Sequence, residues 1–126
     1  LLEILHMNSI EHILLAGYMR ILSPFFLARF PGIVLNIHPS LLPEFPGLHA
    51  QAQQWHAGVR VAGATVHQVD EGMDTGAIVL QGSLLVRGDE GAEGLAERIL
   101  TEVEHVIYAR AVVILLERMQ RGFDIQ

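Results

Sequence analysis

Three side chains in this sequence could together transfer a group between a carbonyl carbon and an amine. Asn36 and His38 follow the apolar run at residues 33–35, a pattern typical of the end of a buried strand. Side chains two residues apart in a strand point to the same side, so both can face one small site, with Ile37 turned into the core. The third side chain is Asp74, in an acidic loop flanked by glycines.

The types of these residues indicate acid–base and oxyanion chemistry. Imidazole titrates closest to neutral pH, and a nearby carboxylate favours its charged form. An amide donor beside an imidazolium suits a position where negative charge develops on oxygen. Asn36 and His38 would hold the oxyanion, His38 would give a proton, and Asp74 would favour charged His38 and pass protons through water. This predicts attack of an amine on a formyl or other activated acyl carbon.

Each of these residues also has a structural explanation. A histidine in a loop is more often structural, and a Gly-flanked acidic loop is usually a solvated turn. Both segments follow strands, so we expect them at one edge of the sheet, where open α/β sheets bind ligands, and this favours a shared site. His67 either lines that site or is a half-buried structural histidine. His49 and His56 share a helix face, but no carboxylate follows at metalloprotease spacing, so we expect no metal.

Composition excludes several classes of protein. The 126 residues suit one domain, and a hydrophobic content of 51% indicates a folded core. A net charge of -6 argues against a nucleic-acid partner, and zero cysteines exclude disulfides and thiolate metal sites. No apolar run reaches the roughly 18 residues of a membrane span, and no secretory signal is visible. We therefore expect a cytoplasmic protein without a membrane partner.

Apolar periodicity and breakers predict the elements. We expect a helix end at 1–8, a strand at 12–16, a helix at 24–30, a strand at 33–37, a Pro-rich loop at 38–48 and a helix at 49–56. A hairpin of strands 61–69 and 78–86 and a helix at 92–120 follow. The apolar face of that last helix is predicted to hold Leu95, Ile99, Val103, Val106, Ile107, Val113 and Leu116. The fold class is α/β, with an open, mostly parallel, Rossmann-like sheet and an antiparallel edge hairpin.

Four segments together resemble one enzyme family. Residues 15–23 (LAGYMRILS), 36–43 (NIHPSLLP), 46–49 (PGLH) and 69–76 (VDEGMDTG) match, in order and at family spacing, glycinamide ribonucleotide formyltransferases. The resemblance implies the formyltransferase fold. It also implies transfer of the formyl group of 10-formyltetrahydrofolate, as co-substrate, to the amine of glycinamide ribonucleotide in purine synthesis, with neither a metal nor a covalent intermediate.

The resemblance also implies roles for individual residues. Asn36 corresponds to the amide at the formyl carbon, His38 to the proton donor, and Asp74 to the carboxylate that favours the protonated histidine. Glu104 corresponds to a carboxylate that binds the ribose hydroxyls of the nucleotide. The folate-binding residues implied are Met19, Arg20, Ile21, Leu22, Asn36, Val69, Asp70, Glu71 and Asp74.

One departure from the family pattern concerns the first part of the domain. The chain begins at Leu1 with the pattern of a helix end, and the family's first strand and Gly-rich phosphate loop lie upstream of the matched segments. We therefore expect residues 1–126 to be the C-terminal portion of a single catalytic domain, a monomer or a homodimer. Alternatives are a related 10-formyltetrahydrofolate enzyme (a hydrolase or methionyl-tRNA formyltransferase) and a non-catalytic folate-binding fragment.

Overall fold

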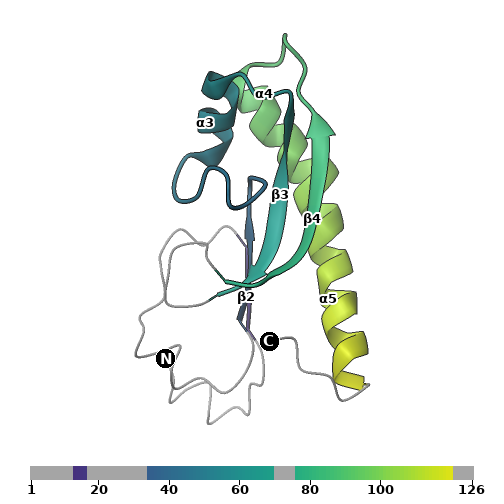
Figure 1. Cartoon of the computed structure of the whole chain (residues 1–126). Helices are drawn as coiled ribbons and strands as arrows, with labels where there is room; N and C mark the ends of the chain where they lie inside the picture. Colours follow the sequence, from purple (N-terminus) through teal and green to yellow (C-terminus); the bar gives the residue numbers. More distant parts are fainter. Residues whose placement is uncertain (1–12, 17–33, 70–75, 121–126) are drawn as a thin grey trace.

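A four-stranded sheet positions the candidate site. The computed structural model describes residues 13–16, 34–69 and 76–120 (Figure 1). The strands are β1 (Ile13–Ala16), β2 (Val34–His38), β3 (Val61–Gln68) and β4 (Ile78–Leu85), in the sheet order β1-β2-β3-β4. β1 pairs in parallel with β2, whereas β2–β3 and β3–β4 are antiparallel. The α/β class and the antiparallel edge hairpin are thus confirmed, and among the described strands one pairing of three is parallel.

The described helices are α3 (Ala50–Ala57), α4 (Gly91–Arg98), the π-helical segment η1 (Ile99–Glu104) and α5 (His105–Gln120). The last three form one continuous rod that packs along the β3–β4 hairpin (Figure 1). Predicted and observed bounds agree within two residues for each described strand and for α3. The helices expected at 1–8 and 24–30 lie outside the described residues.

Both faces of β3 are buried, which makes this strand the centre of the fold. Ala62, Ala64 and Val66 have no exposed surface and pack with Leu35 and Ile37 of β2 in the core beneath the helices. Small and β-branched residues suit this position because a flat apolar surface lets the helical rod approach closely. The opposite face of β3 carries polar side chains, and these belong to the site described below.

The π-helical segment explains the spacing of the buried residues in the rod. These recur every four residues, at Leu95, Ile99, Val103, Ile107 and Ala111. In an α-helix each such step would rotate the side chain by about 40°, so the stripe would wind away from the sheet. The wider π turn at Ile99–Glu104 rotates less per residue and keeps the stripe in line.

The predicted apolar face of this helix is correspondingly wrong at two positions. Val106 is 60% exposed and Val113 is 49% exposed. An unbroken α-helix, the basis of that prediction, would have placed both beside Val103 and Ile107. The side chain of Leu116 lies outside the described ones.

Gly82 of β4 allows the rod to approach the sheet. A Cβ at this position would lie 2.7 Å from Cγ2 of Ile107 and 2.9 Å from Cγ1 of Val103. Real Cβ contacts are longer than this, so any side chain at Gly82 would push the π turn outward.

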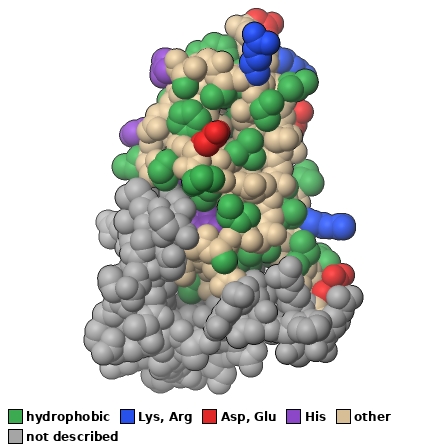
Figure 2. Space-filling view, in the orientation of Figure 1, with side chains coloured by type: hydrophobic (Ala, Val, Ile, Leu, Met, Phe, Trp, Pro, Cys, Tyr) green, Lys and Arg blue, Asp and Glu red, His purple; other side chains and the backbone are tan. Residues whose placement is uncertain are grey.

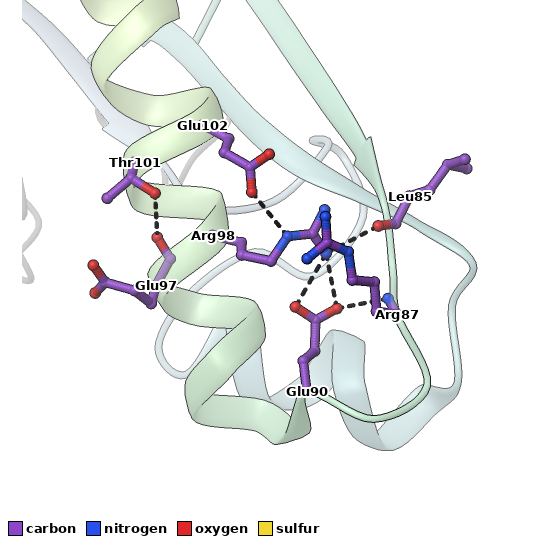
Figure 3. Close-up of polar contacts among 7 residues, drawn as sticks. All are labelled: Leu85, Arg87, Glu90, Glu97, Arg98, Thr101 and Glu102. Carbon is purple, nitrogen blue, oxygen red and sulfur yellow. Dashed lines mark hydrogen bonds and ion pairs between the residues drawn. The ribbon is translucent and has the colours of Figure 1, made fainter.

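An arginine joins the end of the hairpin to the start of the rod (Figure 3). Arg98 Nη1 lies 3.0 Å from both carboxylate oxygens of Glu90 and donates to Leu85 O at 3.1 Å, while Nε donates to Glu102 Oε2 at 2.8 Å. Glu90 also accepts a bond from the backbone N–H of Arg87 at 2.6 Å. Desolvation opposes the shift, but these hydrogen bonds and the arginine charges lower the pKa of Glu90. This cluster connects the end of β4 and the turn that follows it to the last residue of α4.

Candidate functional site

Strand pairing brings polar side chains together on the face of the sheet opposite the helical rod. His38 of β2 pairs with Thr65 of β3, which pairs with Gln81 of β4. In the neighbouring row, Asn36 pairs with His67. Directly opposite residues share a face, so these five side chains form one polar strip across three strands.

The ring of His38 is held at the end of β2. His38 is only 6% exposed, and its Nε2 lies 2.8 Å from the carbonyl oxygen of Phe45. A carbonyl only accepts hydrogen bonds, so Nε2 carries a hydrogen in this arrangement. In the neutral ring the lone pair then resides on Nδ1.

Asn36 presents an unsatisfied group beside this ring. Its Oδ1 is buried and has no hydrogen-bond partner among the residues that the structure describes. Buried amide oxygens nearly always have partners, so such an atom indicates a place where a ligand could donate a hydrogen bond. Ile37, between Asn36 and His38, lies in the apolar core, as the alternation of side chains predicts.

The expectation that the acidic loop leaves the sheet at the same edge as His38 is wrong. β3 runs antiparallel to β2, so Gln68 pairs with Leu35 and the N–H of Val69 bonds to Val34 O at 2.8 Å. The chain therefore leaves β3 beside Val34 and Leu35 at the start of β2, rather than beside His38. Sequence patterns could not show this, because they do not distinguish a parallel from an antiparallel partner.

Several predicted site residues fall outside the described part of the chain. These are Asp74 of the catalytic set and the folate-binding candidates Met19, Arg20, Ile21, Leu22, Asp70 and Glu71. The structure describes Asn36, His38, Val69 and Glu104. Of these it places Asn36 and His38 on one face of β2, as the spacing predicts.

Glu104 ends the π-helical segment and belongs to the helical layer, which packs on the face of the hairpin opposite Asn36 and His38. The residue is half-buried. Desolvation raises the pKa of its carboxyl group, and the charge of the neighbouring His105 partly offsets this effect. A half-buried carboxylate is costly unless it serves a ligand or a partner, so Glu104 remains a candidate binding residue.

Sequence reasoning missed three polar residues that contact the loop after His38. These are Gln54 of α3, whose Nε2 donates to Pro39 O at 2.7 Å, and Thr65 and Gln81, whose hydrogen bonds are described below. The alternation in β3, which predicts Thr65 and His67 on one side, was the available signal. His67 is 2% exposed and lies opposite Asn36, so it contributes to the polar strip.

One face of the molecule carries few charges. Over the part that is not grey, Figure 2 shows mostly hydrophobic and uncharged atoms, with basic side chains at the margins, an acidic side chain among the hydrophobic ones and a histidine near the centre. In residues 34–69 and 76–120, no three His, Asp or Glu side chains cluster as metal ligands would, and no helix there is long and apolar enough to cross a bilayer.

Known proteins are similar to this chain in both sequence and fold. The chain is 44% identical over 122 residues to phosphoribosylglycinamide formyltransferase of Bacillus subtilis, covering 97% of this chain and 62% of the relative. The crystal structure of phosphoribosylglycinamide formyltransferase from Bacillus halodurans superposes with a TM-score of 0.86 at 44% identity, over 93% of this chain and 60% of that one. A formyltetrahydrofolate deformylase from Pseudomonas putida matches with a TM-score of 0.78 at 36% identity, over 93% of this chain and 41% of that one.

These matches cover nearly all of this chain but only part of the related proteins. The chain spans about 60% of the length of the first two of these proteins. A profile of the formyl transferase family matches residues 1–112, nearly the whole chain. The strand that carries both Asn36 and His38, β2, lies inside this match, and the chain belongs to the formyl transferase family.

Proposed function

We propose that this chain is the C-terminal portion of one catalytic domain that transfers the formyl group of 10-formyltetrahydrofolate to the amine of glycinamide ribonucleotide, a step of purine biosynthesis. The observation that carries the proposal is the amide oxygen of Asn36, which lies on the same face of β2 as His38 and has no hydrogen-bond partner among the described residues. The names of two relatives, which are phosphoribosylglycinamide formyltransferases, support the choice of substrates.

The chemistry follows from the two side chains. The amine nitrogen attacks the formyl carbon, and the carbonyl oxygen becomes an oxyanion that Asn36 Nδ2 and charged His38 stabilise. Asn36 Oδ1 accepts a hydrogen bond from the attacking amine, which satisfies this atom. The bond between the formyl carbon and N10 then breaks, N10 takes a proton, and the amine loses one. His38 supplies the proton from Nδ1 while Nε2 stays bonded to Phe45 O.

Other residues complete the proposed site. Asp74 favours the charged form of His38 and relays protons through water. The segment of Met19, Arg20, Ile21 and Leu22 and the segment of Val69, Asp70, Glu71 and Asp74 form the two walls that bind the folate, with Asn36 between them. Glu104 binds the ribose hydroxyls. No metal takes part, because the amide and the imidazolium stabilise the oxyanion.

The first test is formyl transfer by wild-type protein and by His38→Ala. We expect a loss of kcat on the order of 10²–10⁴-fold, the usual contribution of a general acid that also stabilises an oxyanion. His56→Ala is the matched control, because His56 is an exposed histidine on α3 outside the polar strip. Equal rates for wild type and His38→Ala would contradict the proposed mechanism.

A second candidate function is hydrolysis of 10-formyltetrahydrofolate, which the likeness to the deformylase favours. Water would then replace the amine at the formyl carbon, and formate would be released. The two reactions are separated by measuring tetrahydrofolate release with and without glycinamide ribonucleotide. Release that depends on the nucleotide supports transfer, whereas equal release with formate as product supports hydrolysis.

The proposal also defines the setting of the reaction. We infer a cytoplasmic enzyme that acts on two small-molecule substrates and has neither a nucleic-acid nor a membrane partner; the net charge of -6 argues against the nucleic acid. It acts as a monomer or a homodimer, and sedimentation equilibrium distinguishes the two.

A further inference from the structure

The loop at residues 39–45, which follows His38, is anchored through its backbone by a buried hydroxyl. Thr65 has no exposed surface. Its Oγ1 donates to Ser40 O at 2.7 Å and accepts from the N–H of Leu42 at 3.0 Å. One side chain on β3 therefore satisfies a donor and an acceptor of the loop.

Gln81 on the neighbouring strand completes this anchor. Its Nε2 donates to Leu42 O at 2.9 Å and to Thr65 Oγ1 at 3.0 Å. Both amide hydrogens are thus used, one on the loop and one on the hydroxyl that holds the loop. We call Thr65 and Gln81 the loop anchor.

The loop in turn holds the ring of His38. Ser40 Oγ shares its hydrogen between Glu44 O at 2.6 Å and Phe45 O at 3.2 Å, and Phe45 O also accepts from His38 Nε2 at 2.8 Å. The position of this carbonyl oxygen therefore favours hydrogen on Nε2 of the neutral ring. That position depends on the backbone that the loop anchor fixes.

We propose that Thr65 and Gln81 are positioning residues, which hold His38 in the Nε2–H form and so reserve Nδ1 for proton transfer. This inference rests on the proposed function for its catalytic consequence. Without the hydroxyl, the N–H of Leu42 and the carbonyl of Ser40 would lose their partner in a buried place, and the loop would move to satisfy them.

Thr65→Val tests the anchor, because valine keeps the shape and removes the hydroxyl. We expect kcat to fall on the order of 10²-fold, as for a misplaced catalytic group, with KM for both substrates nearly unchanged. Thr65→Ser keeps a hydroxyl and should restore kcat, which distinguishes positioning from packing. Gln81→Leu is a second variant that should still fold. Gln81 lies on an outer strand of the described sheet, and its side chain is exposed to solvent.

The matched control is Gln53→Leu. Gln53 Nε2 also donates to a loop carbonyl, Leu48 O at 2.9 Å, but at an exposed place outside the anchor. This variant should keep the wild-type kcat. A fall in kcat as large as that of Gln81→Leu would show that loss of any glutamine contact near the loop suffices, and would overturn the proposal.

A second readout does not depend on turnover. ¹⁵N NMR of histidine-labelled protein reports which ring nitrogen of His38 is protonated when the ring is neutral, with His38→Gln to assign the signals. Wild type should show protonated Nε2, whereas Thr65→Val and Gln81→Leu should show a mixture of the two forms. An unchanged Nε2–H signal in both folded variants would contradict the inference. If the wild type has no formyl-transfer activity, the proposed function fails, and this spectrum still decides the role of the anchor.

Discussion

A single amide illustrates how function can cost stability at the scale of a residue. Asn36 Oδ1 is buried without a partner among the described residues, and such a group costs about 1–3 kcal/mol. The same atom, together with Nδ2, gives the site an acceptor and a donor beside His38. Strained or unsatisfied groups of this kind are expected where a ligand completes the hydrogen bonding.

Asn36→Leu therefore separates stability from activity. Leucine has a similar size and no polar atoms, so the free energy of unfolding should rise by about 1 kcal/mol, while kcat should fall on the order of 10²–10³-fold. Urea denaturation and the formyl-transfer assay measure the two effects. A variant that loses both stability and activity would indicate that Asn36 is mainly structural.

The contribution of Glu104 to the free energy of unfolding should fall as pH rises, whereas that of a carboxylate in an ion pair rises with pH. Its pKa is raised by burial above the usual 4.5, so the folded state holds the proton more tightly than the unfolded state. Stability is then lost as pH rises from the usual value through the raised one. Glu104→Gln should be more stable than wild type above this range, equal to it below, and weaker in nucleotide binding.

Thermal unfolding across pH, together with calorimetry of nucleotide binding, checks this prediction. The control ligand is the folate, whose affinity should not change in Glu104→Gln. Unchanged nucleotide affinity in that variant would remove the proposed ribose contact and leave Glu104 without a binding role.

At the scale of elements, the π turn and Gly82 form a matched pair. The four-residue spacing of Leu95, Ile99 and Val103 needs a turn wider than an α-helix, and this turn packs against the bare backbone at Gly82. The pair explains both the burial of the rod and the exposure of Val106. It also determines where Glu104, the last residue of the turn, lies on the rod.

Gly82→Ala should lower the free energy of unfolding by about 1–3 kcal/mol, because the new methyl group overlaps Val103 and Ile107. Gly88→Ala is the control, since a Cβ there meets nothing within 4 Å. Chemical denaturation of both variants measures the difference. Similar values for the two would show that the rod shifts away from the sheet without cost.

At the scale of the whole molecule, β3 should be the last strand to open. It pairs on both sides, with β2 and β4, and its residues from Ala62 to His67 are buried on both faces. Amides of such a strand exchange only in global unfolding. Hydrogen exchange should therefore be slowest at Ala64 and Val66 and faster in β4. Fast exchange in β3 would place the stable core elsewhere.

Much of this fold follows from local pattern. The apolar runs predict the strands, the glycine at 58 ends α3 in a left-handed conformation with φ of 71°, and the two-residue spacing puts Asn36 and His38 on one face. These features depend on residues close in the chain, whose geometry is set by backbone sterics and the strand repeat. The resemblance to formyltransferases rests on the same local segments.

The residue types and their spacing alone thus determined the strands, the hairpin and the pair of catalytic candidates. Only the tertiary structure decided that β3 runs antiparallel to β2, which moves the start of the acidic loop away from His38. It also decided that Thr65 and Gln81 hold the loop after His38. Thr65 is 23 positions from its partner Leu42 in the sequence, and Gln81 is 39 positions from the same residue. The reason is physical: a periodic pattern reports which side of an element is buried, whereas strand direction and long-range hydrogen bonds depend on what packs against that side.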